Sequence, residues 1–292
     1  MEQTVEPPGR HARPVHVRPE DGHVIRAEDF VHPGLEARES VGPYARVQAV
    51  GSLLMVHDST VEAGRGIGHH PHQGMERLFY LLEGTLDHDD ALNHITGHMG
   101  TGDLGILTEG RRGMIHSEWN HGAVDARAFI LVYPNRPLAP SAAFDAERDA
   151  EARRSEPAPG VRTKHVLEHG APRVGGDVRG LADSALEAGA TLPLRWDPEE
   201  AGLVFVVSGA VRVDHAAGDD ASPGAPSDEP QVASTLEALE ALEAPEALEA
   251  LEAGHSLALP PRTTGWHLTA TADRPTRLLH VATGAGHGVR LR

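Results

Sequence analysis

Short apolar runs, separated by Gly and Asp, recur along the chain from about residue 45 to residue 133. Their spacing of roughly 8–12 residues is typical of an all-β sandwich or barrel and not of alternating strands and helices. A similar stretch follows after a segment rich in Pro, Ala and charge, so the pattern predicts two β-domains and indicates a duplicated barrel. The runs that we expect to form strands are 47–56, 77–82, 104–107, 114–119 and 128–133, and then 202–213, 256–259 and 277–282.

The same pattern divides the chain into segments. Residues 1–24 are polar and aperiodic, which predicts a flexible N-terminal arm. Residues 25–133 are expected to form the N-terminal domain, 134–160 a linker, and 161–292 a second β-domain.

Within the second domain, residues 216–254 repeat Leu-Glu-Ala five times and carry ten acidic residues but no Lys or Arg. A three-residue repeat does not match the helical period of 3.6, and Pro245 would interrupt a helix. We therefore expect a disordered acidic insertion about 216–254 rather than a partner-binding helix.

Composition excludes several classes of function. The 292 residues carry a formal net charge of −17, which would repel a phosphate backbone, so nucleic-acid binding by a general basic surface is excluded. The absence of cysteine excludes disulfides, thiolate catalysis and Cys-based metal sites. No apolar run approaches the ~20 residues of a membrane span, and the first thirty residues contain no signal peptide. We therefore expect a cytoplasmic protein without membrane contact, acting as a monomer.

Four metal-binding side chains form two pairs in the first half of the chain. His70 and His72 are two residues apart, and so are His116 and Glu118. Because side chains alternate between the faces of a strand, the members of each pair share a face. If both strands line one barrel, three imidazoles and one carboxylate converge. Such donors suit iron, manganese, nickel or copper, with zinc as an alternative, and positions left open would suit oxygen activation.

The two pairs together are stronger evidence than either pair alone. The chain contains 20 His, and a single solvated His-x-His pair would be unremarkable in it. Here both pairs lie in consecutive β-segments bounded by glycine turns at 83–84, 100–103 and 110–113. The alternative is that these four polar residues lie on one strand face and are either exposed to solvent or hydrogen-bonded to other groups.

The runs HPHQGMERLFYLLEGTLDHDD and MGTGDLGILTEGRRGMIHSEWN resemble the pirin family, a branch of the cupins. The resemblance is dense over 66–120, continues to 133 and is faint in the second half. It implies two stacked cupin (jelly-roll) β-barrels with one metal, usually iron as Fe(II), in the N-terminal barrel. The family's ligands are the two His of HPH and the His and Glu of H-x-E, which fall on His70, His72, His116 and Glu118.

The chain departs from the family pattern in two places: the loop 110–113 is one residue longer, and the acidic insertion is foreign to the family. The second barrel has TLPLRW where a ligand pair would stand, as is usual in this family, so we expect no metal site there.

Other polar residues near the pair motifs have two interpretations each. Glu76 either supports the metal ligands or belongs to the pocket, with a solvated strand residue as the equal alternative. Arg111 and Arg112 are either at the pocket mouth or ordinary turn residues, which we favour. The run 87–90 (Asp-His-Asp-Asp) is assigned to a solvated hairpin turn.

The resemblance implies two main functions. The first is a metal-dependent dioxygenase of the quercetinase type, acting with O₂ on an aromatic or flavonol-like substrate, with Glu118 as ligand and proton acceptor. The alternative is a metal-loaded regulator that docks on an enzyme or transcription factor as its protein partner. A small-ligand-binding cupin is a third option. An open pocket beside the metal would favour the enzyme, and a blocked pocket the regulator.

Overall fold

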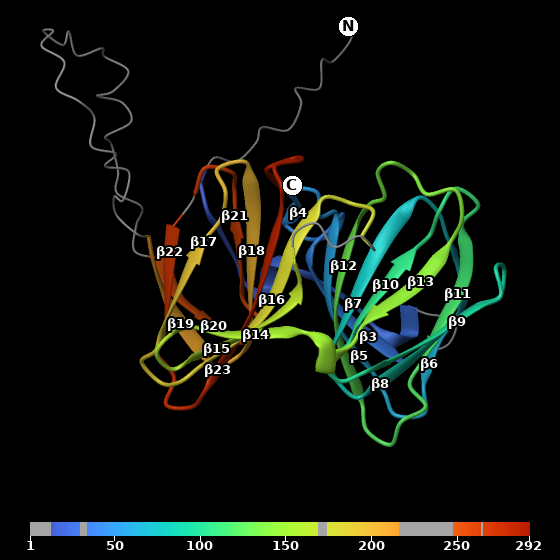
Figure 1. Cartoon of the computed structure of the whole chain (residues 1–292), viewed down its shortest axis with the longest axis horizontal. Coiled ribbons are helices and arrows are strands. Elements are labelled where there is room, and N and C mark those ends of the chain that lie inside the picture. The colour runs from blue at the N-terminus through green and yellow to red at the C-terminus, as the bar shows by residue number, and fades with distance from the viewer. Residues whose placement is uncertain (1–12, 30–33, 169–173, 216–247, 264) are drawn as a thin grey trace, which may run out of the picture.

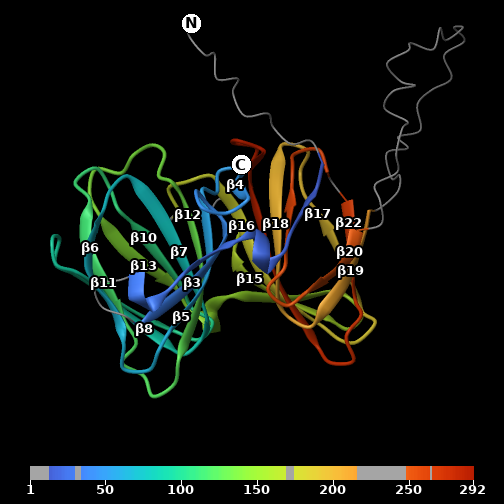
Figure 2. The same cartoon turned by 180° about the vertical axis from the view of Figure 1, so that it is seen from behind.

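The computed structural model describes residues 13–29, 34–168, 174–215, 248–263 and 265–292. These residues form β-strands and three single-turn 3-10 helices, arranged as two β-barrels that lie side by side (Figures 1 and 2). The predicted all-β, two-barrel architecture is confirmed. Among the described residues, no helix has the length and apolar character needed to cross a membrane. The 3-10 helices are η1 (Pro19–Asp21), η2 (Ala27–Asp29) and η3 (Asp149–Glu151).

The N-terminal barrel consists of a large sheet that faces a small one. In the large sheet the order is β13 (Ala143–Glu147), β10 (Leu104–Thr108), β7 (Met75–Glu83), β12 (Ala126–Pro134), β5 (Met55–Val61), β3 (Leu35–Val41), β4 (Val47–Val50) and β24 (Val289–Leu291), with β2 (His23–Ile25) also pairing with β3. In the small sheet it is β6 (Gly66–His72), β11 (Met114–Trp119), β8 (Thr85–Asp90) and β9 (Ile95–Gly100).

The second barrel repeats this plan. Its large sheet has the order β1 (Val15–Val17), β21 (Ser256–Leu259), β18 (Glu200–Ser208), β23 (Thr276–Gly284), β16 (Val178–Leu186), β15 (Val161–Leu167) and β14 (Arg153–Ala158). Its small sheet has the order β17 (Thr191–Arg195), β22 (Gly265–Ala270), β19 (Ala210–His215) and β20 (Leu248–Glu252).

The two large sheets pack against each other, and this explains why their central strands are apolar on both faces. On β12, Phe129 and Leu131 belong to the cluster shared between the barrels, whereas Ala128 and Ile130 belong to the interior cluster of the N-terminal barrel. Phe129 stacks on Phe205 of β18, with ring centroids 5.0 Å apart. Because side chains alternate along β12, one set packs in the interface between the barrels and the other set packs in the interior of the N-terminal barrel.

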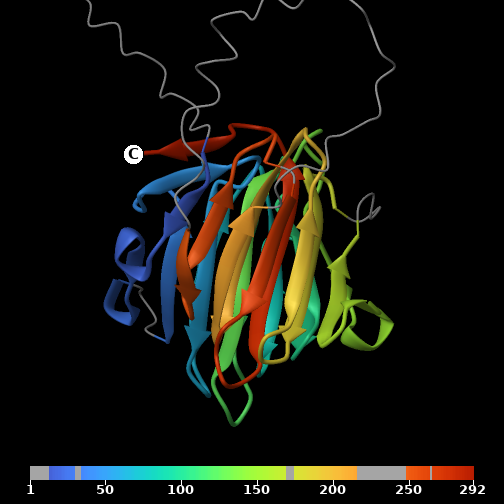
Figure 3. The ribbon, with the colours of Figure 1, turned by 90° about the vertical axis from the view of Figure 1, so that its left-hand side faces the viewer.

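Both ends of the described chain cross to the other barrel, which the sequence analysis does not predict. Val15 and Val17 of β1 are buried and pair with β21 of the second barrel, so residues 15–17 are not part of a loose arm. At the other end, β24 joins β4 in the sheet of the N-terminal barrel, which Figure 3 shows as a red strand beside a blue one. Strands of three residues carry too little pattern to be recognised, and their pairing partners are distant in sequence.

The expected linker 134–160 also contains regular structure. Strand β13 pairs with β10 at the edge of the first barrel, and β14 pairs with β15 at the edge of the second. Their charged side chains face solvent on edge strands, which is why composition alone indicates a loop.

The acidic insertion is shorter than expected at its C-terminal end. Residues 216–247 lie outside the described residues, but 248–252 form β20, which pairs with β19. Leu251 is fully buried in the core of the second barrel. The last two Leu-Glu-Ala repeats therefore contribute to a strand, which the buried Leu251 anchors in the core of the barrel.

A half-buried histidine in the second barrel predicts acid sensitivity. Removal from solvent and the charge of His165, opposed by Asp183, together lower the pKa of His280 to about 4. Its Nε2 lies 3.1 Å from the Ser184 hydroxyl. As the pH falls from about 6.5 towards 4, the unfolded chain takes up a proton at this position that the folded chain does not.

Acidification to pH 4.5 should therefore remove about 2–3 kcal/mol of folding free energy through His280. Urea unfolding at pH 7 and pH 4.5 measures this difference. The variant His280→Gln should lose less stability over the same interval. An unchanged pH dependence in that variant would assign the acid sensitivity to other groups.

Candidate metal centre

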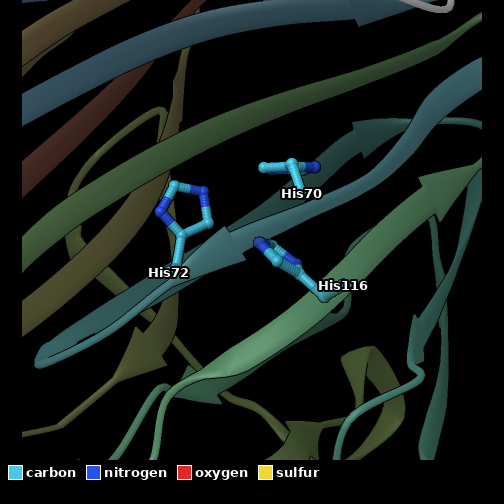
Figure 4. Close-up of side chains that lie close together, drawn as sticks. All are labelled: His70, His72 and His116. Atoms are coloured by element: carbon cyan, nitrogen blue, oxygen red, sulfur yellow. The ribbon is translucent and has the colours of Figure 1, made fainter.

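Three imidazoles meet on the inner face of the small sheet. His70 and His72 alternate along β6, and His116 lies directly opposite His70 on the antiparallel strand β11. The ring centroids are 4.5 Å apart for His70 and His116, 5.0 Å for His72 and His116, and 4.9 Å for His70 and His72. One nitrogen of each ring lies within 4.8 Å of the others, and Figure 4 shows the three rings facing one another.

Glu118 lies beside this cluster but is held by a different set of contacts. Its Oε1 accepts a hydrogen bond from His116 Nδ1 at 2.6 Å and another from His88 Nδ1 at 3.0 Å. His88 stands opposite Glu118 in the register of β8 and β11. A shift of register between His116 and Glu118 on β11 displaces the carboxylate along the strand. The structure thus places the three imidazoles in one group of possible metal ligands, and Glu118 in an adjoining group with His88 that shares His116.

The electrostatics keep His70 and His72 neutral and the carboxylate of Glu118 charged. Burial, followed by the charge of Arg77, lowers the pKa of His72 to about 3, and burial also lowers the pKa of His70. Burial works to raise the pKa of Glu118, but the adjacent imidazoles of His116 and His88 outweigh it and hold this pKa well below its ordinary value. Neutral imidazole and ionised carboxylate are the forms that bind metal ions.

The donor atoms of His116 and His70 fit a metal ion. Because His116 gives its Nδ1 to Glu118, its buried Nε2 is left without a hydrogen-bond partner among the described residues. His70 Nδ1 donates to the Gly68 carbonyl at 2.8 Å, which leaves its Nε2 as the lone-pair nitrogen. A hydrogen bond at one ring nitrogen that orients the other is the usual arrangement of a metal-binding histidine.

His72 differs from the other two. Its Nδ1 accepts a hydrogen bond from Arg77 at 2.8 Å, and Arg77 is in turn held by the buried carboxylate of Glu109 at 2.8 Å. The ring proton of neutral His72 therefore stands on Nε2. A cation can bind His72 at Nε2 only if this proton leaves, and at Nδ1 only if the hydrogen bond from Arg77 is broken.

A cavity of about 470 Å³ opens beside the imidazoles, between the two sheets of the barrel. His70, His72, His116 and Glu118 all line it from the small sheet. Most of the remaining wall is apolar and comes from the large sheet and β8. Among the apolar lining residues are Leu35, Met55, Val61, Phe79, Leu86 and Ile130.

The sequence analysis assigns His88 incorrectly. Residues 87–90 belong to strand β8 and not to a solvated turn, and His88 is only 2% exposed. Besides Glu118, it contacts Phe144, on which its ring stacks at 5.3 Å. The inward position of His88 could be predicted from alternation, because Leu86, His88 and Asp90 share the inner face of the strand. Arg111 and Arg112 are exposed and do not line the cavity, in agreement with the favoured interpretation.

Glu76 is neither a pocket group nor a solvated residue. Its side chain is fully buried and does not line the cavity. Oε1 accepts hydrogen bonds from the Tyr133 hydroxyl at 2.6 Å and the Gly175 amide at 2.9 Å. Oε2 accepts from Thr108 Oγ1 at 2.9 Å and Asn135 Nδ2 at 3.1 Å. One carboxylate therefore ties β7, β10 and β12 to the segment that leads into the second barrel.

Metal-binding side chains gather only in the N-terminal barrel, within the part of the chain that the structure describes. Both groups of three or more such residues, one of His70, His72 and His116 and the other of His88, His116 and Glu118, lie there. In the second barrel, β17 carries Thr-Leu-Pro-Leu-Arg at the corresponding place. That the second barrel has no metal site stays a prediction.

Part of the chain is similar in sequence to known proteins. Residues 26–131 match the sequence model of the Pirin family. The quercetin 2,3-dioxygenase of Escherichia coli K12 is 38% identical over 74 residues, which is 25% of this chain and 31% of that protein. The first curated relatives are thus matched over about a third of their length, 36% and 31%. The predicted resemblance to the pirin family is confirmed.

Two solved structures show the same fold. Quercetin 2,3-dioxygenase from Acinetobacter baumannii aligns over 93% of this chain and 86% of its own, with a TM-score of 0.67 and 18% identity. A bacterial pirin from Escherichia coli, in complex with nickel(II), aligns over 90% and 99%, with a TM-score of 0.61 and 18% identity. The predicted two-barrel cupin fold is confirmed.

Proposed function

We propose that this chain, a pirin-type cupin, is a metal-dependent dioxygenase acting on an aromatic, flavonol-like substrate. The observation that carries the proposal is the cavity of about 470 Å³ beside the three imidazoles. A volume of this size accommodates a drug-sized organic molecule. An open pocket favours an enzyme over a protein that acts only through its outer surface. The name of the Escherichia coli relative, quercetin 2,3-dioxygenase, supports the substrate class.

His70, His72, His116 and Glu118 would hold one divalent transition metal, for which we favour Fe(II). Nitrogen and oxygen donors without sulfur suit iron, manganese, nickel, copper and zinc. The bound metal would supply Lewis acidity and a binding place for oxygen atoms of the substrate and of O₂.

The chain's own residues then perform three tasks. The apolar walls of the cavity enclose the substrate's rings and exclude water from the reacting end. The imidazoles would hold the metal at one end of the cavity, which fixes the end at which the substrate oxygens lie. Glu118, held ionised by His116 and His88, accepts the proton that a substrate hydroxyl must lose.

Glu118→Gln tests whether Glu118 accepts the substrate's proton in addition to holding the metal. The amide keeps the size of the side chain and one oxygen donor, but it is a poor proton acceptor. We expect oxygen consumption with a flavonol to fall about 100-fold or more, as removal of a general base usually causes, while metal content falls by less than half. Oxygen-electrode rates and elemental analysis on the same samples measure both quantities.

Iron- or nickel-loaded wild-type protein provides the decisive comparison. Oxygen uptake with flavonols or catechols would support the dioxygenase. If no such compound causes uptake, and a pull-down returns one stoichiometric protein partner, the protein is instead a metal-loaded regulator.

A further inference from the structure

One buried hydroxyl in the cavity wall has no partner. Ser59 is 1% exposed, and its Oγ makes no hydrogen bond to any described residue. It lies on β5 between His57 and Val61, with which it alternates onto the same face, and all three line the cavity beside the imidazoles. A buried hydroxyl without a hydrogen bond destabilises a folded protein. Such a group calls for an explanation in terms of something that it binds.

The neighbours of Ser59 on the two adjacent strands are small. In the register of the large sheet, Ser59 stands opposite Ala37 of β3 and Ala128 of β12. Both alanines also line the cavity. Ala37, Ser59 and Ala128 therefore form a floor of small side chains across three adjacent strands, with one polar atom at its centre. Larger apolar residues, among them Leu35, Val61 and Ile130, stand around this floor.

The floor belongs to the sheet that faces the metal-binding residues. His70, His72 and His116 extend from β6 and β11 of the small sheet, whereas Ser59 extends from β5 of the large sheet. A ligand that fills the cavity thus meets imidazoles on one side and, on the other, a largely apolar wall that carries Ser59 together with His57 and Arg77. This arrangement selects for an aromatic ring system that carries a polar group away from its metal-facing oxygens.

We propose that Ser59 is a specificity-determining residue, whose hydroxyl hydrogen-bonds a second oxygen of an aromatic ligand. The inference rests on the proposed function for the ligand's metal-facing end, but the contact at Ser59 does not require turnover. It adds a recognition point to the site. A site built to hydrogen-bond a ligand hydroxyl discriminates against an analogue that lacks it.

Binding to zinc-loaded protein tests the proposal without any redox chemistry. The probes are 3-hydroxyflavone and its derivatives with one added hydroxyl, at the 7 or the 4′ position. Wild-type protein should bind at least one hydroxylated derivative more tightly than 3-hydroxyflavone. Ser59→Ala should weaken binding of that derivative about 5- to 15-fold and leave 3-hydroxyflavone within about twofold, since one hydrogen bond is lost.

Ser256→Ala is the matched control. Ser256 is also fully buried with an unpartnered hydroxyl, but it lies on β21 of the second barrel and does not line this cavity. Both variants should raise the melting temperature of the ligand-free protein, because each removes an unsatisfied hydroxyl. Only Ser59→Ala should change the ratio of the two affinities.

An unchanged affinity ratio in Ser59→Ala, or equal binding of all probes by the wild type, would overturn the proposal. The failure of the proposed function would look different. In that case iron-loaded protein would consume no oxygen, while zinc-loaded protein would still distinguish the probes through Ser59.

Discussion

Replacing His116 with Ala should abolish metal binding altogether. His116 is the centre of the site, because its ring lies 4.5 Å from that of His70 and 5.0 Å from that of His72, and its Nδ1 bonds Glu118. The substitution removes one donor and also releases the carboxylate that the imidazole orients. We expect metal content to fall from about one equivalent per chain to below about a tenth, with loss of all oxygen uptake.

The measurement is elemental analysis of protein purified without an affinity tag of histidines. His98→Ala is a suitable control, since His98 is exposed on β9 and bonds Asp87 on the outer side of the small sheet. The control should keep its metal. A thermal unfolding transition near that of the wild type shows that His116→Ala is folded. Stoichiometric metal in a folded His116→Ala protein would refute the ligand assignment.

Glu76→Ala should cause the largest loss of stability and leave the metal in place. The substitution leaves four donors without their acceptor. The side chains of Tyr133 and Asn135 are buried, and the Thr108 side chain and the Gly175 amide are half-buried. Burial also raises the pKa of Tyr133 well above its ordinary value, so this hydroxyl stays a donor that needs an acceptor. We expect a cost of about 3–5 kcal/mol, which lowers the melting temperature by about 10 °C.

Chemical unfolding measures the structural role of Glu76, and elemental analysis measures a role in the pocket. Glu83→Ala, at the exposed end of the same strand, should change stability by less than about 0.5 kcal/mol. Loss of metal from folded Glu76→Ala protein would show that Glu76 is a pocket group. A stability close to that of Glu83→Ala would mean that the buried hydrogen bonds contribute little.

The arrangement of the imidazoles could be predicted because it depends on local periodicity. Alternation along a strand places His70 beside His72 and His116 beside Glu118, and one antiparallel pairing then joins the two pairs. The same rule, applied to β7, places Glu76 on the face of Leu78 and Tyr80, which pack against the second barrel. Its position away from the metal was therefore implicit in the sequence.

Other features could not be predicted, since they depend on distant pairing. Nothing local to residues 15–17 or 289–291 indicates which barrel they join. Leu251 lies in a repeat whose three-residue period and negative charge favour a loop. The segment forms a strand because it pairs with the edge of β19. The role of Ser59 depends on the absence of a partner, which a sequence does not show.

The crossing of β24 into the first barrel has a consequence for biosynthesis. Strand β4 pairs with β24, and backbone hydrogen bonds also join Gly51 to Gly288 and His287. At roughly 5–20 residues per second, the roughly 240 residues between the two strands take about 12–50 s to translate. Until then the sheet behind the metal centre has an open edge at β4, which is a template for pairing with other chains. The nascent protein thus has a time window in which a chaperone that shields strand edges would raise its yield.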